Sequence, residues 1–390
     1  MESLVVNRDY ELRERVARWL AERGIEKFEI RPEGDVVKVI VNGEEVAEVK
    51  IENIKNNIVF RARGLLVDEI GQRSKELIMK IEKGKAEPYQ IRALLATDGG
   101  YKAKKGIVHA TTTSVVQAAL YRRFGMKVYY AGYANLTKRG LKPKFIAKLS
   151  SKKWIQLVKA DLENGVKALS SDRASRGALA GMALGLLGRV EISLKGVDKN
   201  TEEGRRKIAE VKRIIMERIE MFARLRLGEG GRVCLANCQF GEKALTYEHE
   251  AYARVIAPLI HYIAEDASVE EVEKFLTYAI LYDGHVRSKQ ARLDVGHFST
   301  KKEKLPLDIY DKVSLYMILA AKYSVEVRKV YIGENDARIY FNHVAKMFAT
   351  AWADFSELLR WANVYRLYDH IFRKLRRMAK MAIKPTLSRW

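Results

Sequence analysis

The 390-residue chain has few cysteines, no long apolar run and no nucleotide-binding glycine loop. Cysteine occurs only at Cys234 and Cys238, which excludes a framework of disulfides. Their close spacing could supply only part of a zinc site, so we interpret both as small hydrophobic residues. The glycines at Gly99-Gly100 and at 228–231 lack the spacing and the following Lys-Ser or Lys-Thr of a phosphate loop, which argues against an NTPase.

Apolar segments of membrane-spanning length are missing as well. The longest apolar stretches fall short of the roughly eighteen residues that a transmembrane helix needs. The start, Met1-Glu2-Ser3-Leu4, lacks the basic and apolar regions of a signal peptide. We therefore expect a cytoplasmic protein without a membrane partner.

Basic residues outnumber acidic ones by a wide margin. The chain has 71 lysines and arginines against 49 aspartates and glutamates, a formal net charge of +22. Such an excess predicts a polyanionic partner, because basic side chains displace the counterions that condense on nucleic acid. The alternative is a solvated charged surface in a basic proteome.

The length predicts about two or three packed units. Residues 1–87 have the pattern of a small α+β unit, with an amphipathic helix at 10–23, alternating strands over 27–63 and a second helix at 65–83. The pair Asn42-Gly43 predicts a tight hairpin there. Two further segments are predicted as a mainly helical insertion, 163–267, and a basic C-terminal tail, 365–390.

An internal duplication organises the rest of the chain. Residues 88–162 and 268–364 are each expected to follow the order helix, two strands, helix, two strands, helix. The first opens with Pro88, which suits the first turn of a helix. The second opens with the capping box Ser268-Val269-Glu270-Glu271. The predicted segments are helices at 88–97, 115–124, 152–162, 269–282, 307–322 and 346–361, and strands at 101–104, 107–113, 127–133, 144–149, 285–288, 290–297, 325–332 and 337–343.

The opening helices of the two segments end alike. The first reads Ile91-Arg92-Ala93-Leu94-Leu95-Ala96-Thr97-Asp98-Gly99, and the second reads Leu276-Thr277-Tyr278-Ala279-Ile280-Leu281-Tyr282-Asp283-Gly284. With the strand pattern that follows each, the sequence resembles the LAGLIDADG homing endonuclease family in its single-chain form. The resemblance covers about half of the chain. The bulky Tyr278 and Tyr282 depart from the small residues usual at this helix contact and predict a wider crossing. More loosely, the chain resembles repeat-encoded archaeal proteins of unknown function, of the Pyrobaculum type.

The resemblance implies an α+β saddle that acts as a monomeric, magnesium-dependent, site-specific nuclease on double-stranded DNA. The family's acidic residues correspond to Asp98 and Asp283, which would hold Mg²⁺ or another divalent cation. The metal site would include the adjoining Gly99 and Gly284. Basic groups that position water in the family suggest catalytic roles for Lys152 and Lys346.

A physical argument supports the same acids. If the two motif helices pack together, two carboxylates lie close to each other and to the negative ends of two helix dipoles. A divalent cation would neutralise that charge, and paired metals can hold the attacking water and the leaving oxygen of a phosphodiester. The alternative is that Asp98 and Asp283 only end their helices.

In the family the concave sheet faces enter the major groove, so polar strand residues that alternate with apolar ones are candidate DNA contacts. The basic C-terminal residues would contact phosphates. An ordinary solvated strand face is the alternative for each position. The candidates are Lys102, Lys104, His109, Thr111, Lys144, Lys148, Arg287, Lys289, Arg292, Arg328, Arg338, Arg373, Arg376 and Arg377.

Two rival functions remain open at this point. The first is an inactive DNA-binding regulator or an RNA-splicing maturase on the same fold, with RNA as the partner in the second case. The second is a structural or protein-interaction role in which the charge serves solubility.

Overall fold

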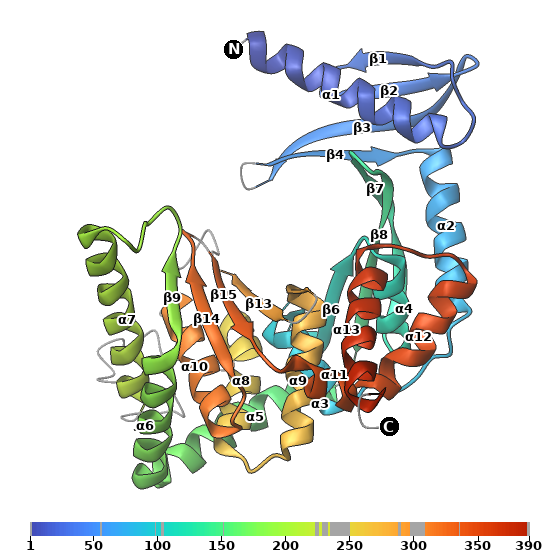
Figure 1. Ribbon diagram of the computed structural model, residues 1–390. Helices are drawn as coiled ribbons and strands as arrows, with labels where there is room; N and C mark the ends of the chain where they lie inside the picture. Colours follow the sequence, from blue (N-terminus) through green and yellow to red (C-terminus); the bar gives the residue numbers. More distant parts are fainter. Residues whose placement is uncertain are drawn as a thin grey trace. The chain divides into compact units, whose positions relative to one another are not determined.

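The computed structural model describes residues 2–54, 57–97, 99–102, 105–150, 152–222, 226–227, 233–234, 250–287, 290–296, 309–334 and 336–387 (Figure 1). The chain divides into two compact units. Unit 1 comprises residues 1–85, 110–149 and 360–372, and unit 2 comprises 86–109, 150–359 and 373–390. Helices and mainly antiparallel strands make up both units, which confirms the predicted α+β class.

Unit 1 is built on a twisted sheet with the strand order β1-β2-β3-β4-β7-β8-β6. Its α-helices are α1, α2 and α4, together with the end of α12 and the start of α13. The bounds are α1 Glu2–Ala21, β1 Glu29–Glu33, β2 Val36–Val41, β3 Glu44–Ile54, β4 Asn57–Arg63, α2 Leu65–Met79, β6 Ile107–Thr112, α4 Val115–Arg123, β7 Lys127–Thr137 and β8 Gly140–Ser150.

The core of the N-terminal region lies between α1 and the sheet. Apolar residues recur at helical spacing along α1, and two of them, Val16 and Trp19, are completely buried. They pack against strand residues that alternate with outward-facing polar ones, including Val49 and Phe60. The turn at Asn42 and Gly43 has φ of 53° and 83°, the left-handed conformation of the predicted tight hairpin.

Unit 2 holds the two motif helices and a second sheet. Its bounds are α3 Pro88–Ala96, β5 Gly100–Lys102, α5 Lys152–Ser171, α6 Arg173–Arg189, β9 Glu191–Leu194, α7 Glu202–Phe222, β10 Arg226–Leu227, β11 Val233–Cys234, α8 Glu250–Ala264, α9 Val269–Asp283, β12 Gly284–Val286, β13 Ala291–Gly296, α10 Ile309–Lys322, β14 Val327–Ile332, β15 Asp336–Phe341, α11 Val344–Thr350, α12 Trp352–Val364 and α13 His370–Leu387. The boundary between the units falls inside β6, α12 and α13.

The unit 2 sheet has the order β12-β13-β15-β14-β9, in which only β14 and β9 pair in parallel. Helices α9 and α10 pack on one face of it. That face carries the buried alternate residues, such as Leu293 and Ile339. The other face carries the half-buried polar and aromatic residues.

Two runs of strands share one neighbour order. β5-β6-β8-β7 and β12-β13-β15-β14 both place the first strand outermost and the third and fourth strands in reversed order. In both runs a helix precedes each pair of strands and another follows the fourth strand. The order of helices and strands therefore follows the predicted order, while the duplication and the saddle stay predictions.

Several boundaries differ from the predicted ones, including an earlier start of α1 at Glu2, a later end of β7 at Thr137 and an earlier start of β8 at Gly140. Helix α5 continues to Ser171, and the helix expected over 346–361 is two helices, α11 and α12, interrupted at Ala351. The segment predicted as a basic tail forms helix α13, because apolar residues at helical spacing give it a face that is buried. Its buried residues include Ile371, Phe372, Leu375 and Met378.

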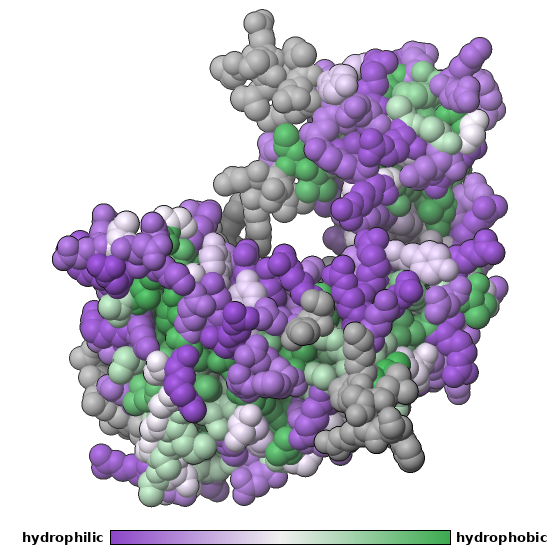
Figure 2. All heavy atoms as spheres, in the orientation of Figure 1, coloured by the Kyte–Doolittle hydropathy of each residue, from purple (hydrophilic) through white to green (hydrophobic). Residues whose placement is uncertain are grey.

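On the side of the molecule shown in Figure 2, hydrophilic residues dominate the exterior. None of the helices in the described ranges combines the length and the apolar character that crossing a membrane requires.

Candidate nucleic-acid interface and acidic site

The two motif helices pack against each other within unit 2. Tyr278 of α9 is fully buried and contacts α3 directly, where Gln90 donates a hydrogen bond to its hydroxyl at 3.2 Å and the Tyr89 ring lies 5.9 Å away. The Tyr278 hydroxyl in turn donates to Asp354 at 3.0 Å. The bulky residue that departs from the family pattern is thus accommodated at the helix contact by partners for its ring and its hydroxyl.

Local sequence explains why α3 and α9 begin where they do. Pro88 takes the first turn of α3, and the side chain of Gln90 accepts a hydrogen bond from the Glu87 N–H at 3.0 Å. The Ser268 hydroxyl caps α9 by accepting from the Glu271 N–H at 3.1 Å.

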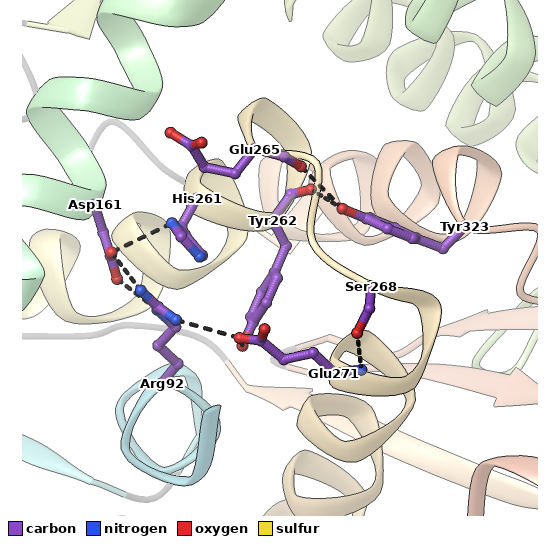
Figure 3. A network of polar contacts seen from close by, with 8 residues as sticks. All are labelled: Arg92, Asp161, His261, Tyr262, Glu265, Ser268, Glu271 and Tyr323. Atoms are coloured by element: carbon purple, nitrogen blue, oxygen red, sulfur yellow. Dashed lines mark hydrogen bonds and ion pairs between the residues drawn. The ribbon is translucent and has the colours of Figure 1, made fainter. Parts of the chain in front are cut away.

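Helix α3 is tied to its surroundings by a buried polar network (Figure 3). Arg92 donates two hydrogen bonds of 2.8 Å to Asp161 of α5 and one of 3.5 Å to Glu271 of α9. Its guanidinium also lies 5.5 Å from the centre of the Tyr262 ring. A bidentate guanidinium–carboxylate pair fixes orientation as well as distance, so the network sets the position of α3 against α5, α8 and α9.

His261 belongs to the same network, with Nδ1 3.4 Å from Asp161. Burial and the Arg92 guanidinium lower the pKa of His261 to about 4. The nearby carboxylate would favour a charged imidazole, but Asp161 already accepts two hydrogen bonds from Arg92, so burial decides and the ring is neutral near pH 7.

Asp283 is the last residue of α9 and is half-buried. Burial, together with the charge of Asp283, raises the pKa of Tyr316 on α10. Lys374 of α13 donates hydrogen bonds to the carbonyl oxygens of Ile280 and Leu281, at 3.3 and 2.8 Å. An ammonium group therefore lies at the negative end of the α9 dipole, beside the candidate catalytic acid.

The partner acid, Asp98, lies outside the described residues. The two glycines that follow the acids are both described. A Cβ on Gly99 would lie 2.5 Å from the Leu94 carbonyl oxygen, and one on Gly284 would lie 2.3 Å from that of Arg292. Both positions require glycine because helix and hairpin meet there without room for a side chain. Their proposed part in a metal site stays a prediction.

The structure describes the side chain of only one of the two candidate catalytic lysines. The side chain of Lys152, the first residue of α5, lies outside the described part. Lys346 is exposed on α11, and its ammonium lies 3.3 Å from Glu273. Because Glu273 precedes Asp283 by ten residues, or ~15 Å of helix axis, the structure does not bring Lys346 next to the acid. The lysine that contacts the C-terminal end of α9 is Lys374.

Cations gather around the start of β12. Burial and the charges of Arg292, Arg377, Arg287 and Lys374, in that order, lower the pKa of His285. Arg377 donates a hydrogen bond of 3.0 Å to the Val286 carbonyl. The predictions included the three arginines as DNA contacts and Lys374 only as part of the basic C-terminal segment, and they missed His285. The helical spacing of apolar residues after residue 370 was the available signal for Lys374.

The outward face of the unit 2 sheet alternates charged and aromatic residues. Cross-strand neighbours on it are Arg292 with Tyr340, and Arg338 with both Asp294 and Tyr331. The Arg338 guanidinium lies 4.9 Å from the Tyr331 ring centre and 2.9 Å from Asp336. Arg292 forms an ion pair of 3.0 Å with Asp294. We call this set the unit 2 face: His285, Arg292, Asp294, Lys329, Tyr331, Arg338 and Tyr340.

Arg328 occupies a different environment from the other candidate arginines. The pairing of β14 with β15 shifts between Val327 and Lys329, so Arg328 lies at a bulge. It lines a cavity of about 830 Å³ beside α6, together with Arg189 and Glu326.

Among the candidates from the first predicted repeat, Lys102 belongs to β5, His109 and Thr111 to β6, and Lys144 and Lys148 to β8. Lys144 and Lys148 approach the rings of Tyr133 and Tyr129 at 5.3 and 5.6 Å. Thr111 is exposed, and the His109 ring covers Gly100 of the neighbouring strand, where a Cβ would lie 2.3 Å from it.

The remaining candidate DNA contacts either lie on α13 or fall outside the described part of the chain. Arg373, Arg376 and Arg377 are exposed on α13. The side chain of Lys102 lies outside the described part, and Lys104 and Lys289 lie outside the described residues. Within the described ranges, no three His, Cys, Asp or Glu residues come together as a metal site would require.

Comparisons with known proteins return no relatives: no family model, no curated protein and no solved structure matches this chain.

Proposed function

We propose that the chain is a monomeric, divalent-metal-dependent endonuclease that binds double-stranded DNA through two related repeats. The main support is the shared strand order of β5-β6-β8-β7 and β12-β13-β15-β14, each preceded by a helix that is followed or closed by an Asp-Gly pair in the sequence. A common order of neighbours is the pattern expected from duplication of one αββαββα unit. On this proposal, the repeats are LAGLIDADG-like and form a saddle.

The surface chemistry supports a nucleic-acid partner. Arg292 and Arg338 are held by Asp294 and Asp336 on the outward face of the sheet, so their guanidinium groups are already oriented. Oriented guanidinium groups suit phosphate oxygens and the acceptor edge of guanine. The net charge of +22 adds long-range attraction to a polyanion.

A divalent cation fits the chemistry at the end of α9. Asp283 is a hard oxygen donor, and Mg²⁺ is usually held by one or two carboxylates plus water and substrate phosphate. When bound, such a cation activates water and stabilises charge on the phosphodiester. Asp283 would hold it, with Asp98 as the proposed second donor.

The chain's own groups contribute the rest of the proposed mechanism. Lys374 places a positive charge at the negative end of α9, which offsets part of the repulsion between this helix end and a DNA phosphate. The sheet faces bind the duplex and orient the scissile bond. Gly284 lets β12 begin directly after the acid, so the cation cluster around His285 lies next to it.

The test is a cleavage assay of the full chain on a randomised duplex library with Mg²⁺. We expect cutting by wild type, and binding without cutting by Asp283→Asn and Asp98→Asn. A matched control is Asp266→Asn, because Asp266 is fully exposed and lies before α9. Binding by wild type with no cleavage under any divalent metal would reject the nuclease.

A second candidate, an inactive regulator or an RNA-splicing maturase, is favoured by one observation. Tyr331 and Tyr340 lie among cations on the unit 2 face, an arrangement that suits stacking with unpaired bases. Tighter binding of structured RNA than of duplex DNA at equal salt would favour this function over the nuclease.

A further inference from the structure

Three cations surround one tyrosine ring in unit 1. The guanidinium groups of Arg61 and Arg63 lie 4.6 and 5.9 Å from the centre of the Tyr133 ring, and the Lys144 ammonium lies 5.3 Å from it. These residues come from β4, β7 and β8, which are consecutive neighbours in the sheet. We call Arg61, Arg63, Tyr133 and Lys144 the Tyr133 cluster.

The pairing of the strands creates the cluster. Strand β4 belongs to the N-terminal region and pairs with β7 through Arg61 and Asn135. Between Tyr130 and Ala134 the register of β7 against β8 shifts, and Gly132 there has φ of 72°. This bulge brings Tyr133 between the cations of the two flanking strands.

The cluster lies on the outward face of the sheet. Phe60, Ala62 and Phe145 are buried, and they alternate along β4 and β8 with Arg61, Arg63 and Lys144. Successive strand side chains point to opposite faces, so the cations lie opposite the core. Lys148 lies on the same face of β8, four residues after Lys144, with Ile146 between them.

Charge compensation within the cluster is incomplete. Arg61 forms an ion pair of 2.9 Å with Glu52. In the part of the chain that the structure describes, neither Arg63 nor Lys144 has a carboxylate within 4.0 Å. Like charges that gather around a half-buried ring repel one another, and a bound anion would relieve this repulsion.

We propose that the Tyr133 cluster binds the phosphate backbone of the nucleic acid and extends the contact surface onto the N-terminal region. This inference rests on the proposed function, but it assigns a role to residues 1–85. The ring face of Tyr133 holds the guanidinium groups by cation–π attraction and leaves their N–H edges for phosphate oxygens. Cations on the two strands that flank β7 fit a backbone better than a single small anion.

The experiment compares two double variants of the full chain by fluorescence anisotropy on a long DNA duplex at several salt concentrations. Arg63→Gln with Lys144→Gln removes two cations of the cluster. Lys27→Gln with Arg139→Gln removes two exposed cations elsewhere in unit 1. We expect the cluster variant to lower the slope of log K against log salt by about 1.8, at about 0.9 for each lost phosphate contact. The control variant should stay close to wild type.

A third variant separates charge from geometry. Tyr133→Leu keeps every cation but removes the ring, so affinity should fall about two- to five-fold, the equivalent of one cation–π contact. Equal slopes for the cluster and control variants would overturn the inference and leave the proposed function standing. A wild type that binds no duplex or RNA even at low salt would overturn both, and an acidic protein would then be the better partner for the cluster.

Discussion

Gly284 shows how one residue can be required by packing next to a candidate catalytic acid. Its backbone is not in the left-handed region, with φ of −143°, so conformational freedom is not the reason for glycine. The carbonyl oxygens of Arg292 and Ile280 would lie 2.3 and 2.7 Å from a Cβ. The requirement arises because α9 turns directly into β12, and it would hold whether or not Asp283 binds a metal.

The change Gly284→Ala should therefore destabilise unit 2 by about 1–3 kcal/mol, the usual range for overpacking. Gly181→Ala is the matched control. Gly181 is in the middle of α6 with open space where a Cβ would be, so alanine there should stabilise by about 0.5–1 kcal/mol through helix propensity. Thermal unfolding followed by circular dichroism measures both, and a neutral Gly284→Ala would contradict the packing explanation.

At the scale of elements, α3 is held by a polar network rather than by apolar contacts alone. Arg92 and Asp161 are both more than nine-tenths buried, and Glu271 and Tyr262 complete the network between α8 and α9. Breaking a buried ion pair by removing one partner typically destabilises by about 3–5 kcal/mol. The position of one motif helix thus depends on residues far from it in the sequence.

The neutral His261 in this network gives stability a pH dependence. Its folded pKa of about 4 is below the unfolded value of 6.5, so the unfolded chain binds more protons between these values. The contribution is complete above pH 6.5 and is lost as the pH falls toward 4, by up to about 3 kcal/mol.

Chemical denaturation across that range should show a smaller fall in stability for His261→Gln than for wild type. The same change at His343, whose side chain is 85% exposed, controls for the loss of an imidazole. Parallel curves for wild type and His261→Gln would show that protonation of this ring does not destabilise the fold.

At the scale of the whole molecule, the charge is distributed in a way that favours a long anionic partner. Basic residues occur on the outward sheet faces of both units and on the exposed side of α13. A partner that reached several of these places would displace many counterions. Affinity should then depend steeply on salt.

Binding of the wild-type chain to a long duplex should weaken by about 10³-fold or more between 50 and 200 mM salt, as six or more phosphate contacts require. Titrations at several salt concentrations measure the slope. A slope near zero would indicate that the charge serves solubility and would favour the structural role.

The sequence by itself determined the local elements of this protein. Hydrophobic periodicity and turn chemistry are local properties, so the hairpin at Asn42-Gly43, the cap at Ser268 and the helix ending at Asp283 could be predicted from neighbours in the chain. The order of strands and helices in the two predicted repeats followed from the same signals.

Only the tertiary structure decided which distant residues meet. Lys346 lies beside Glu273, and Lys374 lies at the end of α9, because helix docking depends on contacts between remote segments. The pairing of β4 with β7, which brings Arg61 to Tyr133, depends likewise on how the N-terminal strands join the rest of the sheet. Period two shows which residues share a face, but it does not show which strand lies next to it.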